Sequence, residues 1–482
     1  MTRRDDGWLA RIALRCAAFA ERWFPDAWVF AALGVVLVAF AALASGATPH
    51  DTARAFGQGY WSLVPFTLQM VFVVIGGYVV ASAPVVARGI GRLARLPRSG
   101  RGAVAFVAAL SMLSSLLSWG FSLVFGGLLV RALARRADLR MDYRAAGAAA
   151  YLGLGAVWAL GLSSSAAQLQ ANPASMPKEL LAITGVLPFA QTIFLWQSLL
   201  LTLVLVAVSV LVAWRSAPDD AAAVTAQALG VRADGAVGPG QGATGEPRTD
   251  GSVGARPGDW LERSPLLTVL LSLLAFGWLA GEFASRSAAT AIADLNTYNL
   301  LFLSLGLLLH WRPRSFLDAV AKAVPGTAGV LIQFPLYGGI AAMLTGAAGA
   351  DGATLAQRLA QLFVQVAARD TFVPVMGAYS AVLGFFVPSG GGKWLVEAPY
   401  VMQAANALQV HLGWAVQTYN AAEALPNLVN PFWMLPLLGI LGLKARDLVG
   451  YTFVQLLVHV PLVLGLLWLL GLTLSYLPPA MP

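Results

Sequence analysis

Residues 388–401 read Pro-Ser-Gly-Gly-Gly-Lys-Trp-Leu-Val-Glu-Ala-Pro-Tyr-Val and lie inside a long apolar part of the chain. Three consecutive glycines favour an interruption of regular helix, and backbone groups freed from a helix find no hydrogen-bonding partners in lipid. A lysine and a glutamate in the same stretch are costly at membrane depth and usually line a polar cavity. The stretch therefore predicts a broken, re-entrant membrane element built around a polar ligand.

The composition of the whole chain predicts a polytopic membrane protein. Of its 482 residues, 58% are hydrophobic and 11% are charged, whereas soluble domains are about 25% charged. Several stretches of about 18 to 25 residues carry almost no charge, which is enough to cross a bilayer as a helix. The net charge is +8. The basic residues cluster in short loops between apolar segments, as the positive-inside rule requires, which argues against nucleic acid as a partner.

The Lys and Arg clusters predict a multi-pass membrane protein with its N-terminus in the cytoplasm. We expect residues 1–26 to form an amphipathic helix on the inner surface and the Gly/Pro-rich stretch 214–263 to be a flexible cytoplasmic linker. Residues 355–368 are amphipathic and are expected along the outer surface. About nine full spans are predicted by length and charge: 27–45, 63–86, 145–168, 188–213, 264–282, 298–311, 325–344, 411–441 and 448–475.

Two further apolar stretches are expected to enter and leave the membrane on the same side. The run 103–130 has Arg-rich flanks at both ends, so a single crossing would leave one basic cluster outside. A re-entrant hairpin with its tip at 118–122 satisfies both flanks. The run 371–402, which holds the glycines, is expected to form the second hairpin, opening outward.

The order of these elements predicts two inverted membrane repeats. The first covers 27–213 with the hairpin 103–130, and the second covers 264–482 with the connector span 264–282 and the hairpin 371–402. Inverted repeats are a recurring transporter plan, in which the site lies where broken elements meet near the midplane. The expected fold class is therefore an all-α polytopic membrane protein with inverted repeats.

Polar groups interrupt four apolar segments, a hairpin and a broken span in each half. Backbone N–H groups at helix starts attract carboxylates, serine hydroxyls add donors, and glycines let the backbone approach a ligand closely. This chemistry predicts a site for a small anion. The candidate substrate-binding residues are Trp119, Ser122, Ser163, Ser164, Ser165, Ser389, Gly390, Gly391, Gly392, Lys393 and Asn427.

Three charged residues in the second half need separate interpretations. Glu423 is the candidate ligand for a coupling proton or sodium ion, because an acid at membrane depth is usually functional. Lys393 would add positive charge to the anion site. It also precedes Glu397 by four residues, so on a helix the two side chains can pair, and we consider them a candidate gate pair that closes the outer hairpin.

Each of these features also has a purely structural explanation. Serines in membrane helices often bond the carbonyl four residues back, and glycines often permit close helix packing. Lys393 can extend to the interface, and Glu423 or Asn427 can be solvated or paired beside a cavity. The chain offers no catalytic triad, zinc spacing, Walker loop or dinucleotide fingerprint. We therefore expect no enzyme activity, cofactor or metal, and transport driven by an ion gradient or by the solute itself.

At these residues the chain resembles the bacterial short-chain fatty acid (acetoacetate/butyrate) transporters, over most of its length except the linker. The resemblance implies uptake of small monocarboxylates across the plasma membrane, a fold of the wider ion-transporter superfamily, and a homodimer that works by an elevator-type motion. The matching segments are Pro388–Trp394 with Pro399, Asn430–Trp433, Leu443–Asp447 with Gly450 and Tyr451, Trp119–Phe121, Trp158 with Gly161–Ser163 and Ser165, Arg22–Trp23 with Pro25–Asp26, and Gln333–Pro335.

The chain departs from the family pattern on both sides of the presumed site. Lys393 stands where the family usually has Gln or His, and Glu397 stands where it usually has Gln. Two alternatives therefore stay open beside the monocarboxylate carrier. One is a carrier of another organic anion, such as a dicarboxylate or an amino-acid derivative, and the other is a non-transporting membrane scaffold or sensor. The remaining departures are Ala424, Leu425, Pro426, Leu160 and Ser164.

Overall fold

The computed structural model describes residues 27–231, 259–387, 389–430 and 432–481. Within them the chain is helical apart from turns and loops, and its only extended pairings are two isolated bridges. The all-α prediction is therefore confirmed for the described chain. The amphipathic helix expected at 1–26 and the linker residues 232–258 lie outside the described residues.

Seven helical stretches of the described chain are long and apolar enough to cross a membrane. The prediction of a polytopic membrane protein is confirmed by these stretches. They are Pro49–Ser82, Gly100–Leu117, Tyr143–Ala171, Trp196–Ser216, Leu266–Ser285, Pro313–Gly346 and Ala445–Gly471. Shorter apolar helices accompany them at Trp28–Ala44, Trp119–Ala134, Leu295–His310 and Phe372–Phe385.

The first half begins with helix α2 and a long helical stretch made of α3 and α4. The expected span 63–86 is extended at its start, because α3 and α4 follow one another as a single stretch of 34 residues. The helices are α2 (Ala27–Ala44), α3 (Pro49–Ser62), α4 (Val64–Ser82), α5 (Pro84–Leu93), α6 (Gly100–Leu117), α7 (Trp119–Ala134), α8 (Tyr143–Leu152), α9 (Ser165–Ala171), α10 (Lys178–Thr184) and α11 (Trp196–Ser216).

The second half has a matching order, with α16 and α17 again forming one stretch of 34 residues. The helices are α12 (Asp259–Arg263), α13 (Leu266–Ser285), α14 (Ala288–Ala293), α15 (Leu295–His310), α16 (Pro313–Ala323), α17 (Ala328–Gly346), α18 (Leu355–Val366), α19 (Phe372–Phe386), α20 (Gly390–Ala407), α21 (Leu412–Asn427), α22 (Leu435–Leu441) and α23 (Ala445–Gly471). The division into two inverted repeats stays a prediction.

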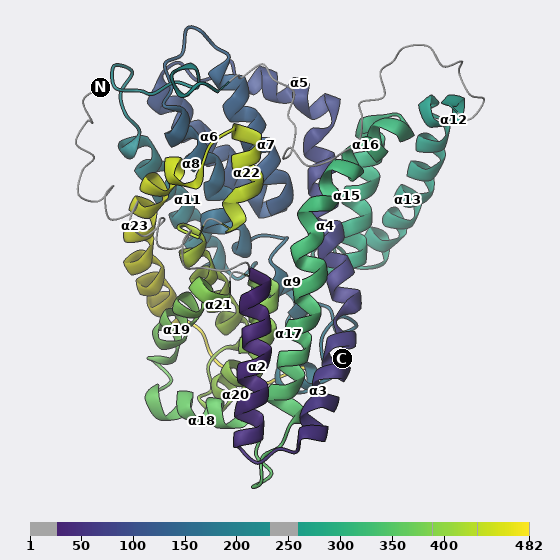
Figure 1. Cartoon of the computed structure of the whole chain (residues 1–482), viewed down its shortest axis with the longest axis vertical. Coiled ribbons are helices and arrows are strands. Elements are labelled where there is room, and N and C mark those ends of the chain that lie inside the picture. Colours follow the sequence, from purple (N-terminus) through teal and green to yellow (C-terminus); the bar gives the residue numbers. More distant parts are fainter. Residues whose placement is uncertain (1–26, 232–258, 388, 431, 482) are drawn as a thin grey trace.

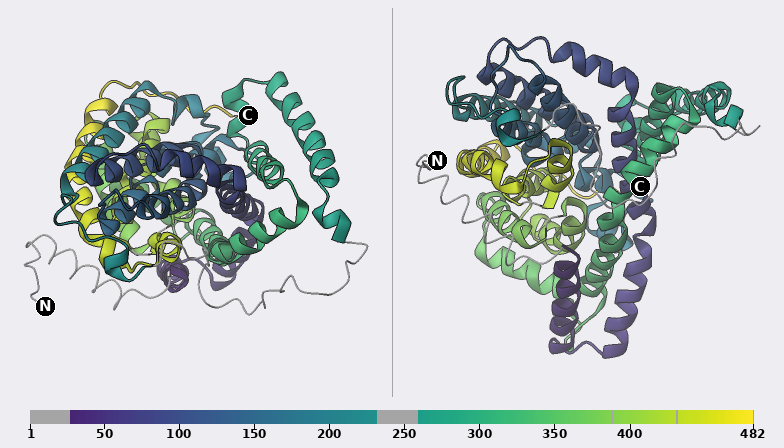
Figure 2. Two further views of the ribbon diagram at one scale, coloured as in Figure 1. Left: turned by 90° about the horizontal axis from the view of Figure 1, so that it is seen from above. Right: turned by 45° about the horizontal axis from the view of Figure 1, so that its top comes forward.

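The helices are arranged as a main body with one helix on its flank (Figure 1). In the body α17 packs against α2, α3 and α20, and α15 packs against α4. On the flank α13 contacts α15, and Figure 2 shows it standing apart from the rest. Large apolar side chains of α13 are exposed, among them Leu274 at 73% and Trp278 at 45%. This surface is suited to lipid or to another apolar protein face.

Both stretches expected to form hairpins fold as pairs of helices joined by a short break, and their entry and exit on one side of the membrane stays a prediction. In the first, α6 ends at Leu117, Ser118 is extended, and α7 begins at Trp119 and packs back against α6. In the second, α19 and α20 are separated at residues 387–389. The hydroxyls of Tyr379 and Tyr400, one on each of these helices, are 2.8 Å apart. Both interruptions therefore fall inside apolar stretches, as the glycines and serines predict.

The part of the expected linker that the structure describes is anchored to the helices. The backbone N–H of Val224 donates to Asp142 Oδ2 (3.0 Å), and its carbonyl accepts from the N–H of Tyr143 (2.9 Å). Arg101 Nε donates to the carbonyl of Ala217 (2.9 Å), and Ala226 is buried. Residues 217–231 are thus held against the ends of α6 and α8.

Candidate functional site

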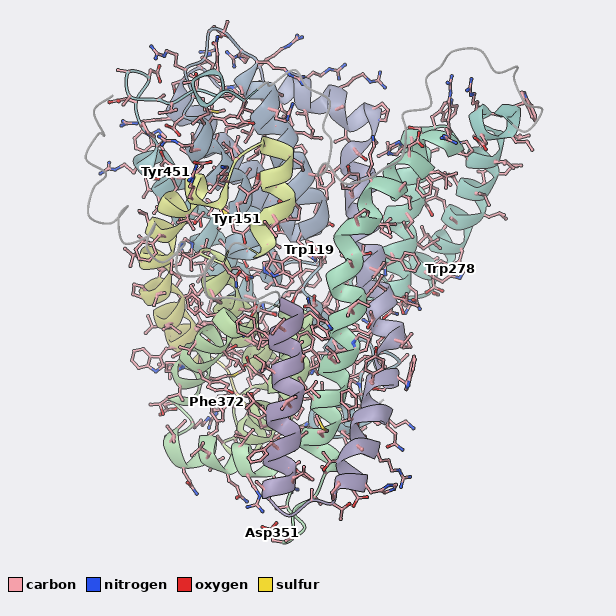
Figure 3. All side chains as sticks on the ribbon, in the orientation of Figure 1. Trp119, Tyr151, Trp278, Asp351, Phe372 and Tyr451 are labelled. Atoms are coloured by element: carbon pink, nitrogen blue, oxygen red, sulfur yellow. The ribbon has the colours of Figure 1, made fainter. Side chains whose placement is uncertain are left out.

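The four interrupted segments predicted from the sequence meet in the middle of the molecule. The N–H of Trp119 donates to Ser163 Oγ (3.0 Å), which joins the first hairpin to the first broken span. Ser164 Oγ donates to Asn420 Oδ1 (3.2 Å), which joins that span to α21. Tyr151 donates to the carbonyl of Asn427 (2.9 Å). Figure 3 shows Trp119 and Tyr151 between Tyr451 on one side and Asp351 at the far tip.

In the first half, hydroxyls and a glycine create the breaks. Ser118 Oγ accepts from the N–H of Phe121 (3.4 Å) and thereby caps α7. After α8 the chain passes through a π turn and a 3₁₀ turn and leaves the helix at Gly161. A Cβ on Gly161 would lie 2.4 Å from the Leu116 backbone. Only glycine permits that approach. Ser164 Oγ then accepts from the N–H of Ala167 (3.3 Å) and caps α9.

In the second half, Ser389 begins α20 in the same way. Its hydroxyl accepts from the N–H of Gly392 (3.2 Å). The first N–H groups of any α-helix have no acceptor within the helix, so those of Gly390 and Gly391 project from the start of α20. The carbonyl of Gly390 accepts from the hydroxyl of Tyr419 on α21 (2.5 Å). The start of α20 is therefore fixed in position while its first amides still lack intrahelical partners.

The three glycines serve close packing as well as backbone approach. A Cβ on Gly390 would lie 2.2 Å from the Trp158 ring, and one on Gly392 would lie 2.1 Å from the Tyr337 ring. A Cβ on Gly391 would meet the Cβ of Ser165 at 3.1 Å. The packing explanation is thus supported by the structure. The contacts of Gly390 with Trp158 and of Gly391 with Ser165 bring the start of α20 against the first broken span.

Lys393, Glu397 and Glu423 form a buried group that we call the charge cluster. Lys393 Nζ lies 3.1 Å from Glu397 Oε1 and 2.7 Å from Glu423 Oε2, and all three side chains are 0% exposed. Lys393 Nζ also donates to the carbonyl (2.8 Å) and the hydroxyl (2.7 Å) of Ser380 on α19. The pairing predicted for Lys393 and Glu397 is confirmed. The ammonium is already surrounded by acceptors, so we no longer assign it to the anion.

Buried polar atoms without hydrogen-bond partners within the described chain concentrate around the breaks. Buried polar groups are nearly always hydrogen-bonded, so such a concentration marks a place suited to a polar ligand. Trp158 and Trp119 offer indole N–H donors, Asn427 offers an amide oxygen, and Gln168 offers both ends of its amide. These residues belong to the same segments as the predicted site. Three further atoms are likewise buried and without a hydrogen-bond partner in the described chain: Gln417 Nε2, Tyr337 Oη and Trp394 Nε1.

The predicted site residues differ in how directly they can reach a ligand. Ser122 is buried, and its hydroxyl donates to the carbonyl of Ser111 on α6 (2.6 Å), so it holds the hairpin together. Ser163 and Ser164 are engaged with Trp119 and Asn420, as described above. Ser165 stands in the first turn of α9 and is 5% exposed.

Several residues at the centre were not predicted. They are Gln168, Tyr337, Ser380, Gln417 and Asn420. One signal was available in the sequence, because Gln417, Asn420, Glu423 and Asn427 recur every three or four residues and so share one face of a helix. The residues on α17 and α19 had no such signal, since only the packing of distant helices brings them to the site.

A separate hollow of about 140 Å³ lies between the start of α21 and the end of α23. Arg369, His411, Trp414 and Trp468 are among the residues that line it. The ends of α19 and α21 that are remote from the breaks contribute Val373 and Trp414 to its lining, and no residue at a break does. This hollow is therefore distinct from the meeting point of the broken helices.

Comparison with known proteins gives one family over nearly the whole chain. The sequence profile described as "Short chain fatty acid transporter" matches residues 8–470. A protein of Escherichia coli K12 is 34% identical over 473 residues, which cover 97% of this chain and 100% of the relative. A protein of Haemophilus influenzae Rd is 28% identical over 467 residues, covering 96% and 100%. Both bear the name "Putative short-chain fatty acid transporter".

Two solved structures share the fold. The YdaH transporter of Alcanivorax borkumensis superposes with a TM-score of 0.57 at 16% identity, covering 93% of this chain and 98% of that one. Neisseria gonorrhoeae MtrF, from a class described as antimetabolite efflux pumps, superposes with a TM-score of 0.56 at 13% identity, covering 97% and 100%. At these identities the likeness concerns the fold of a membrane transporter.

Proposed function

The chain belongs to the short-chain fatty acid transporter family, and on this premise we propose that it is a secondary carrier of small monocarboxylates, such as acetate, butyrate or acetoacetate. The observation that carries the proposal is the meeting of two interrupted hairpins and two broken spans inside one apolar body. Interrupted helices inside a membrane are tolerated where they line a site for a polar solute.

The proposed site holds the carboxylate at the start of α20. The N–H groups of Gly390 and Gly391 lie at a helix N-terminus, where amide donors and the helix dipole favour an anion. The hydroxyls of Ser389, Ser163 and Ser165 and the indole of Trp119 are the further donors that we assign to the carboxylate. Ser164 acts beside them through Asn420, to which its hydroxyl donates. Asn427 orients it through its amide. The ring of Trp158 lies against Gly390 and offers apolar surface to a short alkyl tail.

The proposal includes how the carrier is driven and where it works. A coupling cation, either a proton or sodium, binds at Glu423, and the Lys393–Glu397 pair closes the outer hairpin as a gate. The protein lies in the bacterial inner membrane with its N-terminus in the cytoplasm. The exposed apolar face of α13 faces lipid, and the carrier works as a homodimer with the elevator-type motion of the ion-transporter superfamily.

Exchange of labelled butyrate in proteoliposomes tests the proposal. Purified full-length protein should exchange external labelled butyrate for internal unlabelled butyrate in the absence of any gradient, above the rate of protein-free vesicles. Asn427→Ala should lower the exchange rate several-fold. Ser114→Ala should not, because the Ser114 hydroxyl bonds only carbonyls of its own helix. Acetate and acetoacetate should compete with butyrate.

Two results would contradict the proposal. Absence of exchange with every short monocarboxylate would favour a scaffold or sensor. Competition by dicarboxylates or amino-acid derivatives at lower concentrations than by butyrate would favour a carrier of another organic anion.

A further inference from the structure

We propose that the charge cluster of Lys393, Glu397 and Glu423 takes up one proton when a monocarboxylate binds, so that this chain moves proton and anion together and needs no sodium. The inference rests on the proposed function, because it names the ion that accompanies the substrate of that same site.

The first step is the set of atoms around the Lys393 ammonium. Nζ lies within 3.1 Å of four oxygens, one each from Glu397 and Glu423 and two from Ser380. Carboxylate, carbonyl and hydroxyl oxygens are the ligands that hard inorganic cations prefer. The ammonium thus occupies, as a cation tethered to α20, the oxygen shell in which a mobile cation would bind. Sodium would have to displace it.

The second step is the count of charges. Two carboxylates face one ammonium, and neither glutamate pairs with another cation within the described chain. Glu397 Oε2 and Glu423 Oε1 have no hydrogen-bond partner there, although both side chains are 0% exposed. A buried carboxylate without its own counter-charge is costly. One proton removes the surplus charge and gives one of these oxygens a hydrogen to donate.

The groups packed around the cluster do not supply the missing charge. Besides Lys393, the polar side chains that face the glutamates are the Ser380 hydroxyl, which donates to Glu397 Oε1 (3.2 Å), and phenols, which are neutral at ordinary pH. Lys393 Nζ also lies 4.5 Å from the centre of the Tyr419 ring. The phenols are Tyr337 on α17, Tyr379 on α19, Tyr400 on α20 and Tyr419 on α21.

Charged groups on the other neighbouring helices face elsewhere. Lys178 and Glu179 of α10 are exposed. Arg358 of α18 is paired with Asp351 at 2.7 Å on the surface. On α23, His459 bonds Ser209 Oγ (2.8 Å) and the carbonyl four residues before it. Changes of pH between 6 and 8 should therefore act on substrate binding through the cluster.

The third step joins the cluster to the substrate. Lys393 lies one helical turn after Gly390 on α20, and Glu423 lies one turn before Asn427 on α21. An anion at the start of α20 therefore brings a second negative charge next to the surplus charge of the cluster. Their repulsion in a medium of low dielectric constant is relieved when the cluster binds a proton. By linkage, the proton strengthens anion binding as much as the anion strengthens proton binding.

The number of protons taken up per butyrate bound tests the proposal directly. Calorimetry of the full-length protein in detergent, in buffers of different protonation enthalpy, measures this number. We expect about one proton per butyrate, and an affinity that weakens by up to about tenfold per pH unit from pH 6 to 8, since butyrate itself is ionised above about pH 5. Sodium should leave the affinity unchanged.

Variants separate charge balance from other roles of the same residues. Glu397→Gln, with Glu423→Gln as the second variant, leaves one acid and one base, so proton uptake should fall to nearly zero. Lys393→Gln together with Glu397→Gln leaves one surplus acid again, so uptake should return to about one. Ser380→Ala keeps all three charges and should keep the proton. Lys393→Gln alone should gain a response to sodium, because the tethered cation is gone.

The outcomes distinguish this inference from the proposed function. If the unmodified chain binds and exchanges butyrate with no proton uptake, or with stimulation by sodium, the inference is wrong and the carrier function stands. The same holds if single and double variants take up the same number of protons. If no short monocarboxylate binds or exchanges, both fall. Melting curves identify variants that do not fold. If all variants fail to fold, the proton uptake and the sodium response of the unmodified protein decide whether the inference holds.

Discussion

The two halves of the candidate site build the same kind of interruption with different chemistry. In the first half, the breaks at Ser118 and Gly161 are held by hydroxyl caps and a close backbone contact with Leu116, and no charged side chain takes part. In the second half, the break at Ser389 is again capped by a hydroxyl, but Lys393 of the charge cluster lies about one turn after it.

This difference suggests a division of labour between the halves. Uncharged caps fix the geometry of the first half without adding a charge that depends on pH. A group with two acids and one base can change its charge by one proton, so the second half is where an ion can be coupled to the substrate. Substitutions in the first half should therefore change mainly the affinity for substrate and the stability of the fold. Substitutions in the second half should also change the number of protons that bind with the substrate.

The largest effect is expected for Lys393→Gln, which leaves two buried carboxylates without their base. Removing one partner of a buried ion pair costs about 3–5 kcal/mol, so the free energy of unfolding in detergent at pH 8 should fall by that order. Adding Glu397→Gln should restore more than half of the loss. As a control, loss of the exposed pairs of Arg314 with Glu262 and Asp318 by Arg314→Gln should cost about 0–1 kcal/mol. Equal stability of Lys393→Gln and the unmodified protein would contradict the charges assigned to the cluster.

A smaller loss is expected where the two halves touch. Gly390→Ala would place a Cβ 2.2 Å from the Trp158 ring, and overpacking of this kind costs about 1–3 kcal/mol. Most of the butyrate exchange should be lost with it, because the start of α20 would be displaced. The matched control is Gly465→Ala, which meets nothing within 4 Å in α23 and should be neutral or stabilise by up to about 1 kcal/mol. Full exchange by Gly390→Ala would show that the close approach is unnecessary.

Ser163→Ala in the first half should have a modest effect. It removes the acceptor of the Trp119 N–H, and loss of one such hydrogen bond costs about 1 kcal/mol. The affinity for butyrate should weaken by a few-fold, while its pH dependence stays that of the unmodified chain. Titration of butyrate at pH 6 and pH 8 measures both. A changed pH dependence would break the division between the halves.

The smallest effect is expected for Asp351→Asn, at the tip of the molecule far from the site (Figure 3). The pKa of Asp351 is held below its ordinary value of 3.8, chiefly by the N–H of Ala353, with further contributions from Arg358. A lowered pKa means that the carboxylate's contribution to stability is complete above about pH 4 and is lost only as the pH falls below that. Between pH 6 and 8 the loss in Asp351→Asn should therefore be small and constant, and the pH dependence of the melting temperature and of the butyrate affinity should match that of the unmodified chain. If Asp351→Asn changed the pH dependence of butyrate affinity between pH 6 and 8, the charge cluster would not be the only source of that dependence.

The sequence allows some parts of this structure to be predicted, and the reason lies in locality. The interruptions at Ser118 and Ser389 follow from serines and glycines inside apolar runs, and the Lys393–Glu397 contact follows from spacing along one helix. The ion pair with Glu423 could not be predicted, because it depends on how α20 and α21 pack across many intervening residues. Ser380 and Tyr337 were missed for the same reason. The contact of 217–231 with Asp142 was missed because a Gly/Pro-rich composition predicts a flexible segment and gives no information on its contacts with distant residues.

A structure determined with 4-bromobutyrate tests most directly the central claim that interrupted helices bind the carboxylate. The account predicts carboxylate oxygens at about 2.7–3.2 Å from the backbone nitrogens of Gly390 and Gly391, with the bromine toward Trp158. Bromine in the hollow beside His411 and Trp468, or a helix that runs without a break through Ser118 or Ser389, would contradict it.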